Sequence, residues 1–189
     1  MPLNIPNLLT WLRIILIPLV AGVFYLPDDW LAAHEKNQAA TFMFVLAAIT
    51  DWLDGWLARK LNQQSAFGAF LDPVADKLMV AAALIVLVQL HRVDAVIALV
   101  IIGREITISA LREWMAQIGQ SKSVAVSFLG KVKTAVQMVA IPMLLYHDVL
   151  WGLNPHALGT WLIYVAAVLT LVSMAYYLKA ALPEMWRRG

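Results

Sequence analysis

Long apolar stretches separated by short polar segments dominate the residue pattern of this chain. About 20 helical residues cross the roughly 30 Å hydrocarbon core of a bilayer, and the apolar stretches recur at about that length. The pattern predicts an all-α, polytopic membrane protein in which residues 1–189 form a single domain. Six transmembrane helices are expected, at about residues 8–26, 38–57, 70–90, 94–117, 132–150 and 157–180.

The composition agrees with a membrane protein and excludes other classes. Hydrophobic residues make up 62% of the chain and charged residues only 14%, whereas a typical soluble domain carries roughly 25% charged residues. Most soluble enzymes are therefore excluded. The chain has no cysteine, which excludes a disulfide framework and a thiolate metal site. The net charge of +2 comes without a run of Lys and Arg, so we expect no nucleic-acid partner.

The basic residues are distributed unequally between the two sides of the predicted bundle. Six spans place both termini on one side. The three connections on the other side contain only Lys36 and Arg92, so 12 of the 14 basic residues lie on the side of the termini. Basic residues are enriched on the cytoplasmic side of membrane proteins. Both termini are therefore predicted to be cytoplasmic, in a protein integral to the cytoplasmic (inner) membrane.

Four aspartates gather where two predicted helices meet. Asp51 and Asp54 share a face near the end of the second span, and Asp72 and Asp76 share a face near the start of the third. The connection between these spans is short, so they are antiparallel neighbours and both pairs can point at one spot. Ionisable residues inside a membrane are functional candidates by default. We expect the site to face the cytoplasm.

The carboxylate cluster favours a site for divalent cations. Four carboxylates this close cannot all stay ionised in a low-dielectric setting without cations. Oxygen ligands suit hard ions such as Mg²⁺ or Mn²⁺, and two such ions can clamp the attacking and leaving oxygens of a phosphoryl transfer. The candidate metal ligands are Asp51, Asp54, Asp72 and Asp76. The structural alternative is a set of helix caps and interfacial charges, with Asp72 as an N-cap before Pro73.

The spacing of these residues resembles a known family motif. The segment reads Asp51-x2-Asp54-Gly55-x2-Ala58-Arg59-x8-Gly68-x3-Asp72-x3-Asp76, which is similar to the complete motif of the CDP-alcohol phosphotransferase family. The similarity extends to residues 6–13, 103–105, 111–114 and 130–134. It implies a six-helix membrane enzyme, generally a homodimer, that transfers a phosphatidyl group from CDP-diacylglycerol to an alcohol and releases CMP.

The basic residues of the fourth and fifth spans bear on the choice of acceptor. Arg104 and Arg112 point to similar sides of the fourth span, and Lys131 and Lys133 lie where the fifth begins. Together they predict a cationic pocket, which favours an acceptor bearing a phosphate, sn-glycerol 3-phosphate. The structural alternative is a buried ion pair between Arg104 and Glu105. Within the family, synthases of cardiolipin, phosphatidylserine or inositol lipids are the other candidates.

A second group of residues is expected to bind CDP-diacylglycerol. It consists of Asn7, Thr10, Arg13, Gly55, Arg59, Ser65 and Gly68. Helix capping is the structural alternative for Asn7 and Thr10, and snorkelling to the lipid head groups is the alternative for Arg13.

Asp76 is the candidate catalytic residue, because it stands at the end of the carboxylate series. A carboxylate there can act as the general base that accepts the proton of the attacking hydroxyl. The alternative is a covalent nucleophile. A cation or proton carrier is disfavoured, because the acidic residues lie at one membrane edge and the two halves of the chain share no motif.

Overall fold

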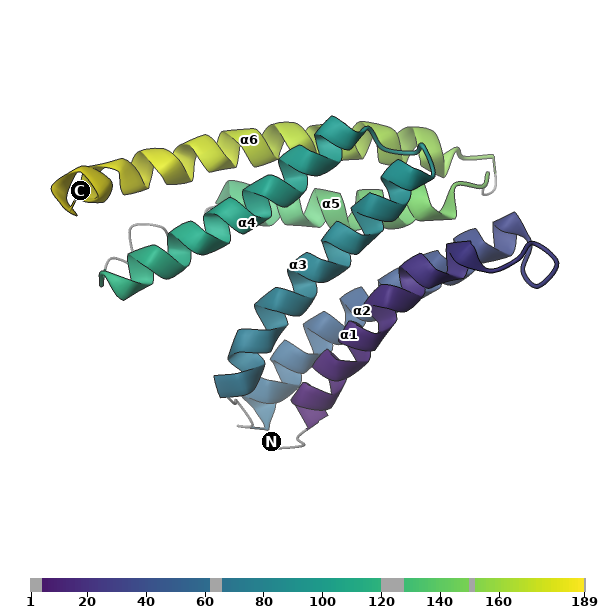
Figure 1. The fold of residues 1–189 in the computed structure, drawn as a ribbon, viewed down its shortest axis with the longest axis horizontal. Helices are drawn as coiled ribbons and strands as arrows, with labels where there is room; N and C mark the ends of the chain where they lie inside the picture. Colours follow the sequence, from purple (N-terminus) through teal and green to yellow (C-terminus); the bar gives the residue numbers. More distant parts are fainter. Residues whose placement is uncertain (1–4, 62–65, 120–127, 150–151, 189) are drawn as a thin grey trace.

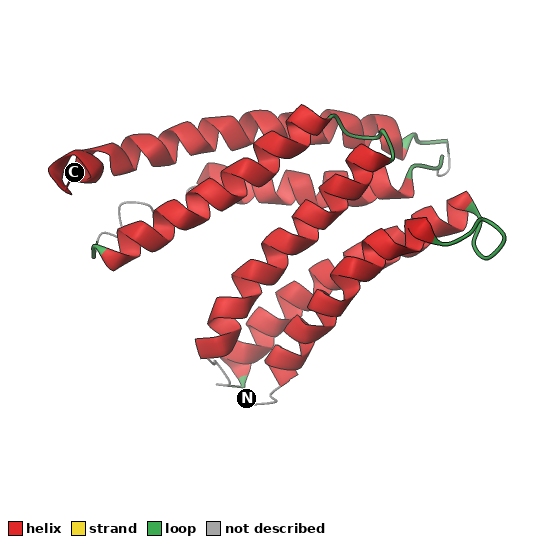
Figure 2. Ribbon diagram, viewed as in Figure 1, coloured by secondary structure: helices red, strands yellow, loops and turns green. Residues whose placement is uncertain are grey.

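The structure is a computed structural model that describes residues 5–61, 66–119, 128–149 and 152–188. These residues form six α-helices and one short 3-10 helix, η1 (Val23–Tyr25), with no β-strand among them (Figure 2). The helices are α1 (Ile5–Gly22), α2 (Ala33–Lys60), α3 (Ala66–Gln89), α4 (Ala95–Gln117), α5 (Phe128–Tyr146) and α6 (Pro155–Arg188). The predicted all-α class is confirmed.

The helices form two groups that α3 connects (Figure 1). α1 packs along α2 and α3, while α6 packs along α5 and α4. Contacts of α2 and α3 with α5, and of α3 with α4, hold the two groups together. In Figure 1 the α1–α2 and α3–α4 connections lie at one end of the molecule, and the start of α1 and the end of α6 lie away from that end.

The residues at the helix ends explain several boundaries. Asp94 is the N-cap of α4, where its side chain accepts a hydrogen bond of 2.7 Å from the backbone N–H of Val96. At the start of α2 the side chain of Glu35 accepts a hydrogen bond from the backbone N–H of Ala32. α3 begins at Ala66, so Asp72 lies inside this helix. The N-cap interpretation of Asp72 is therefore wrong.

The α1 helix shows the inside-out polarity of a membrane helix. Its buried face carries Asn7, Thr10 and Arg13, whereas Ile15 and Leu19 are among its exposed side chains. In water this arrangement would expose apolar area and bury charge, which is unfavourable in both respects. In a bilayer the exposed side chains contact lipid. The other helices also expose large apolar residues to the outside of the bundle.

Three of the helices have the length and hydropathy of membrane spans by themselves. In the described part of the chain these segments are Asn7–Tyr25, Ala33–Leu57 and Pro155–Pro183. α3 contains three charged residues and α4 contains four, which lowers their apolar character. Those charges include Asp72 and Asp76 of α3 and Arg104 and Arg112 of α4, which belong to the candidate site.

Close packing joins α5 and α6. A Cβ atom added at Gly159 of α6 would lie 2.9 Å from Cγ of Leu144 and 3.1 Å from Cβ of Met143. Because glycine lacks a side chain, α6 can approach α5 closely at this point. This contact fixes the position of α6, which carries residues that contact the candidate site.

Candidate active site

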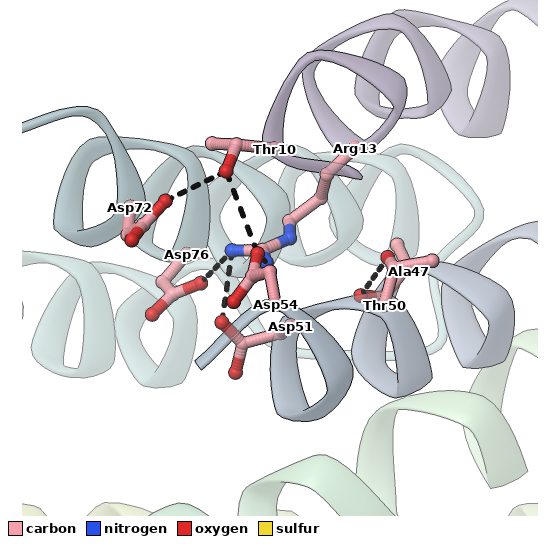
Figure 3. Close-up of polar contacts among 8 residues, drawn as sticks. All are labelled: Thr10, Arg13, Ala47, Thr50, Asp51, Asp54, Asp72 and Asp76. Carbon is pink, nitrogen blue, oxygen red and sulfur yellow. Dashed lines mark hydrogen bonds and ion pairs between the residues drawn. The ribbon is translucent and has the colours of Figure 1, made fainter. Parts of the chain in front are cut away.

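Arg13 lies at the centre of the aspartate cluster (Figure 3). Its side chain extends from α1 towards α2 and α3 and is fully buried. Nη1 lies 2.9 Å from Oδ1 of Asp51 and 2.6 Å from Oδ1 of Asp76, and Nη2 donates a hydrogen bond to Asp54. One guanidinium therefore contacts three carboxylates from two helices.

Thr10 completes the contacts between α1 and the aspartates. It lies one helical turn before Arg13, and its hydroxyl donates a hydrogen bond of 2.7 Å to Oδ1 of Asp72. The same hydroxyl lies 3.5 Å from Oδ2 of Asp54. The structure thus brings together the four aspartates that the sequence spacing placed on facing helix surfaces, with α1 as the element that contacts all of them (Figure 3).

The charge of this cluster is strongly unbalanced. Four carboxylates surround one guanidinium, and the Asp54 side chain is only 4% exposed. The side chains of Asp51 and Asp76 are 37% and 47% exposed, so they also border open space. Burial of unbalanced negative charge is unfavourable, and additional cations relieve it.

The donor set fits divalent cations in its chemistry. All four side chains offer only oxygen ligands, which hard divalent ions prefer. Among the described residues, however, no three acidic or histidine side chains are arranged to hold a metal ion as they stand. The guanidinium of Arg13 lies between the carboxylates of Asp51, Asp54 and Asp76. A metal would require the carboxylates to turn, which the partly exposed Asp51 and Asp76 can do.

A cavity of about 240 Å³ adjoins the cluster. It is lined by Asp51 and Asp76 and also by Glu105 of α4 and Gln137 of α5. Its wall also contains Lys77 and Thr134 and apolar side chains of α3 and α5. A small polar molecule in this cavity would contact the carboxylates and the polar residues of α4 and α5 at the same time.

Two of the predicted acceptor-binding residues converge on Glu105. Lys133 is buried and donates a hydrogen bond to Oε1 of Glu105. Nη1 of Arg104 lies 3.6 Å from Oε2 of the same carboxylate. The ion pair that the sequence allowed for Arg104 is therefore present, and Lys133 joins it. Two cations against one carboxylate leave this group with a positive charge next to the cavity.

Tyr177 of α6 contacts both arginines of α4, and this role was not predicted from the sequence. Its hydroxyl accepts a hydrogen bond of 3.0 Å from Nη2 of Arg112. The guanidinium carbons of Arg104 and Arg112 lie 5.6 Å and 5.2 Å from the centre of its ring, within cation–π range. Ser173, one turn earlier, accepts a hydrogen bond of 3.1 Å from Arg104. Ser173 and Tyr177 are polar residues four positions apart in an apolar helix, and this pattern is the sequence feature that indicates a polar contact there.

Three other residues predicted to bind the nucleotide lipid are Asn7, Gly55 and Gly68. Asn7 is buried on the same face of α1 as Thr10 and Arg13. Gly68 is buried in α3, and Gly55 is half-buried in α2.

The last three predicted residues are Lys131, Arg59 and Ser65. Lys131 is exposed, and because it is two residues from Lys133 it lies on a different face of α5. Arg59 belongs to α2, but its side chain lies outside the described part of the structure, and Ser65 lies outside the described residues altogether.

Comparisons with known proteins agree on one family. A sequence model of the CDP-alcohol phosphatidyltransferase family matches residues 3–172, a range that contains every predicted site residue. A relative from Shigella flexneri serotype 5b (strain 8401), named CDP-diacylglycerol--glycerol-3-phosphate 3-phosphatidyltransferase, is 51% identical over 187 residues. Relatives of the same name from Escherichia coli (strain K12) and Shigella boydii serotype 4 (strain Sb227) are also 51% identical. Each alignment covers 98% of both chains.

Proposed function

Because the chain belongs to the CDP-alcohol phosphatidyltransferase family, we propose that it transfers the phosphatidyl group of CDP-diacylglycerol to sn-glycerol 3-phosphate. The products are phosphatidylglycerophosphate and CMP. The observation that carries this proposal is the cavity that joins Asp76 of the carboxylate cluster to Glu105 of the cationic group. The names of the 51% identical relatives support the choice of acceptor.

The reaction is a direct displacement at phosphorus. The primary hydroxyl oxygen of glycerol 3-phosphate attacks the β-phosphorus of CDP-diacylglycerol, and a new P–O bond forms there. The bond between that phosphorus and the oxygen bridging to the α-phosphate breaks, so CMP leaves with the electron pair. Asp76 accepts the hydroxyl proton as general base. Its position supports this role, because it lines the cavity and its side chain is 47% exposed.

The aspartate cluster is proposed to bind two divalent cations, Mg²⁺ or Mn²⁺. Asp51, Asp54, Asp72 and Asp76 would hold them, since together they supply only oxygen ligands. When bound, the ions neutralise the pyrophosphate and stabilise the charge of the departing CMP. The excess of carboxylates over guanidinium in the cluster supports this assignment.

The nucleotide lipid is proposed to bind along α1 and the facing ends of α2 and α3. Asn7, Thr10 and Arg13 lie on one buried face there. Arg13 supplies a guanidinium that can bind a carboxylate or a phosphate in the same geometry. The other proposed contacts are Gly55, Arg59, Ser65 and Gly68.

The phosphate of the acceptor is proposed to bind Arg104, Arg112 and Lys133 of α4 and α5, whereas Lys131 is exposed on another face of α5 and is not part of this group. The dianionic phosphate needs several cationic donors. Contacts with Tyr177 and Glu105 orient these three side chains. The reacting hydroxyl can then reach Asp76, because Asp76 and Glu105 line the same cavity.

The protein is proposed to span the inner membrane six times, with both termini and the active site facing the cytoplasm, and to act as a homodimer. The unequal distribution of basic residues supports the orientation. The apolar outer faces of the helices support the insertion. Both substrates are then accessible, because CDP-diacylglycerol arrives from the membrane and glycerol 3-phosphate from the cytoplasm.

An acceptor panel tests this function. The purified protein is incubated with CDP-diacylglycerol and, in separate reactions, glycerol 3-phosphate, inositol, serine or phosphatidylglycerol, and the release of CMP is measured. We expect CMP release and phosphatidylglycerophosphate with glycerol 3-phosphate only. An Asp54→Asn variant serves as the inactive control. CMP release with another acceptor and none with glycerol 3-phosphate would overturn the proposed acceptor.

A further inference from the structure

Gln137 of α5 carries a buried polar atom that the fold does not satisfy. The residue is only 2% exposed, and among the described residues its Oε1 atom has no hydrogen-bond donor. A buried amide oxygen without a donor is unfavourable by about 1 to 3 kcal/mol, and such atoms are rare in native proteins. Gln137 also lines the cavity beside the carboxylate cluster. A ligand in that cavity could therefore supply the missing donor.

Gln137 lies on the same helix as Lys133 of the cationic group and lines the same cavity as Asp76, the proposed general base. It follows Lys133 by four residues, so the two side chains lie on the same face of α5. Lys133 contacts Glu105, and Glu105 lines the same cavity as Gln137 and Asp76. Gln137 therefore lines the space that the proposed general base and the cationic group share.

The chemistry of the acceptor leaves one group to be recognised. The phosphate of glycerol 3-phosphate needs cationic donors, and its reacting hydroxyl needs the base. The hydroxyl on C2 remains, and as a donor it cannot be satisfied by Arg or Lys side chains, which have no acceptor atom. An amide oxygen is a suitable partner for it.

We propose that Gln137 determines acceptor specificity, because its Oε1 accepts a hydrogen bond from the C2 hydroxyl of the glycerol 3-phosphate in the cavity. This inference rests on the proposed function and assigns a residue that the carboxylate motif does not contain. Gln137 distinguishes glycerol 3-phosphate from a phosphorylated alcohol that has the same reacting hydroxyl but no second hydroxyl. It contacts substrate without taking part in the bond changes.

A competition between two acceptors tests the proposal. The probes are sn-glycerol 3-phosphate and 3-hydroxypropyl phosphate, which lacks the C2 hydroxyl, mixed in one reaction with CDP-diacylglycerol. The ratio of the two lipid products gives the ratio of kcat/KM values. Because both acceptors meet the same enzyme molecules, this ratio does not depend on the fraction of a variant that folds.

The expected results separate Gln137 from its neighbours. Wild type should prefer glycerol 3-phosphate by about 10- to 100-fold, the effect of an unpaired buried group. Gln137→Met should reduce the preference to about threefold or less, while Gln137→Glu, which keeps an oxygen acceptor of the same length, should retain most of it. Val80→Ala is the matched control. Val80 lines the same cavity, but its side chain has no atom that accepts a hydrogen bond, so the preference should stay unchanged.

Two results would overturn the inference. One is a Gln137→Met enzyme with the preference of wild type, and the other is a Gln137→Glu enzyme that loses the preference as completely as Gln137→Met. Failure of the proposed function looks different, because wild type would then release no CMP with either phosphorylated acceptor.

Discussion

Arg13 and Asp54 form a buried ion pair between α1 and α2, in which the Arg13 side chain is fully enclosed and that of Asp54 is 4% exposed. The same guanidinium contacts Asp51 and Asp76. Removal of one partner from a buried pair leaves an uncompensated charge. Arg13 therefore stabilises the fold as well as the candidate active site.

Replacement of Arg13 should destabilise the protein. For Arg13→Met we expect a loss of about 3 to 5 kcal/mol in the free energy of unfolding, because three carboxylates lose their cation. Thermal unfolding in detergent measures the effect. Lys179→Met is the matched control, since Lys179 is exposed on α6. Equal melting temperatures of the two variants would show that Arg13 does not stabilise the cluster.

Asp76→Asn should slow the reaction without loss of nucleotide-lipid binding. We expect a rate lower by about 10² to 10⁴ fold, the usual effect of removing a general base. Binding of CDP-diacylglycerol should stay nearly unchanged. Asp29→Asn, at an exposed position of the α1–α2 connection, should keep the wild-type rate.

Stereochemistry provides an independent check on the role of Asp76. A direct displacement inverts a chiral β-phosphorus. Net retention would instead indicate two successive displacements and a covalent intermediate on the enzyme. Retention, or an Asp76→Asn enzyme with a near-normal rate, would contradict the general-base role.

Tyr177→Phe should weaken the use of glycerol 3-phosphate specifically. The change removes the hydrogen bond to Arg112 but keeps the ring that both arginines contact. We expect the KM for glycerol 3-phosphate to rise by about 3- to 10-fold, in line with the net value of one hydrogen bond, with kcat and the KM for CDP-diacylglycerol unchanged. Tyr176→Phe changes an exposed neighbour and should have no effect. A proportional loss in both KM values would indicate a general packing role for Tyr177.

The absence of cysteine makes the membrane topology directly testable. A single cysteine at Trp30, which is 76% exposed in the α1–α2 connection, should react with an impermeant thiol reagent in intact cells. A cysteine at Lys122 should react only after the membrane is opened, because that segment is predicted to be cytoplasmic. The reverse pattern would invert the proposed orientation.

The number of helices could be predicted from the sequence, but their ends could not. α2 begins at Ala33 and α6 continues to Arg188, each beyond the predicted span. The apolar pattern ends where the hydrocarbon ends, whereas backbone hydrogen bonds continue the helix into the polar region. The misplaced cap at Asp72 has another cause: a proline is common in the first turn of a helix, but Pro73 lies inside α3, which begins at Ala66.

The aspartate cluster could be predicted because its geometry is local. Spacings of three and four residues place side chains on one helix face, and a short connection brings two faces together. The contact between Arg112 and Tyr177 joins residues 65 positions apart. Helical periodicity indicates which face each residue occupies but not which helix it meets, so Tyr177 and the central position of Arg13 required the structure.

The most direct test of the proposed metal-dependent phosphatidyl transfer is the formation of phosphatidylglycerophosphate by chelator-treated enzyme as Mg²⁺ is added back. The reaction contains CDP-diacylglycerol and glycerol 3-phosphate, and the lipid product and CMP are measured together. If the carboxylate cluster binds the metal ions, no product forms in excess chelator, and Mg²⁺ or Mn²⁺ restores full activity. Asp51→Asn, Asp54→Asn and Asp72→Asn should each reduce both the restored activity and metal binding. Full activity in metal-free buffer with excess chelator would contradict it.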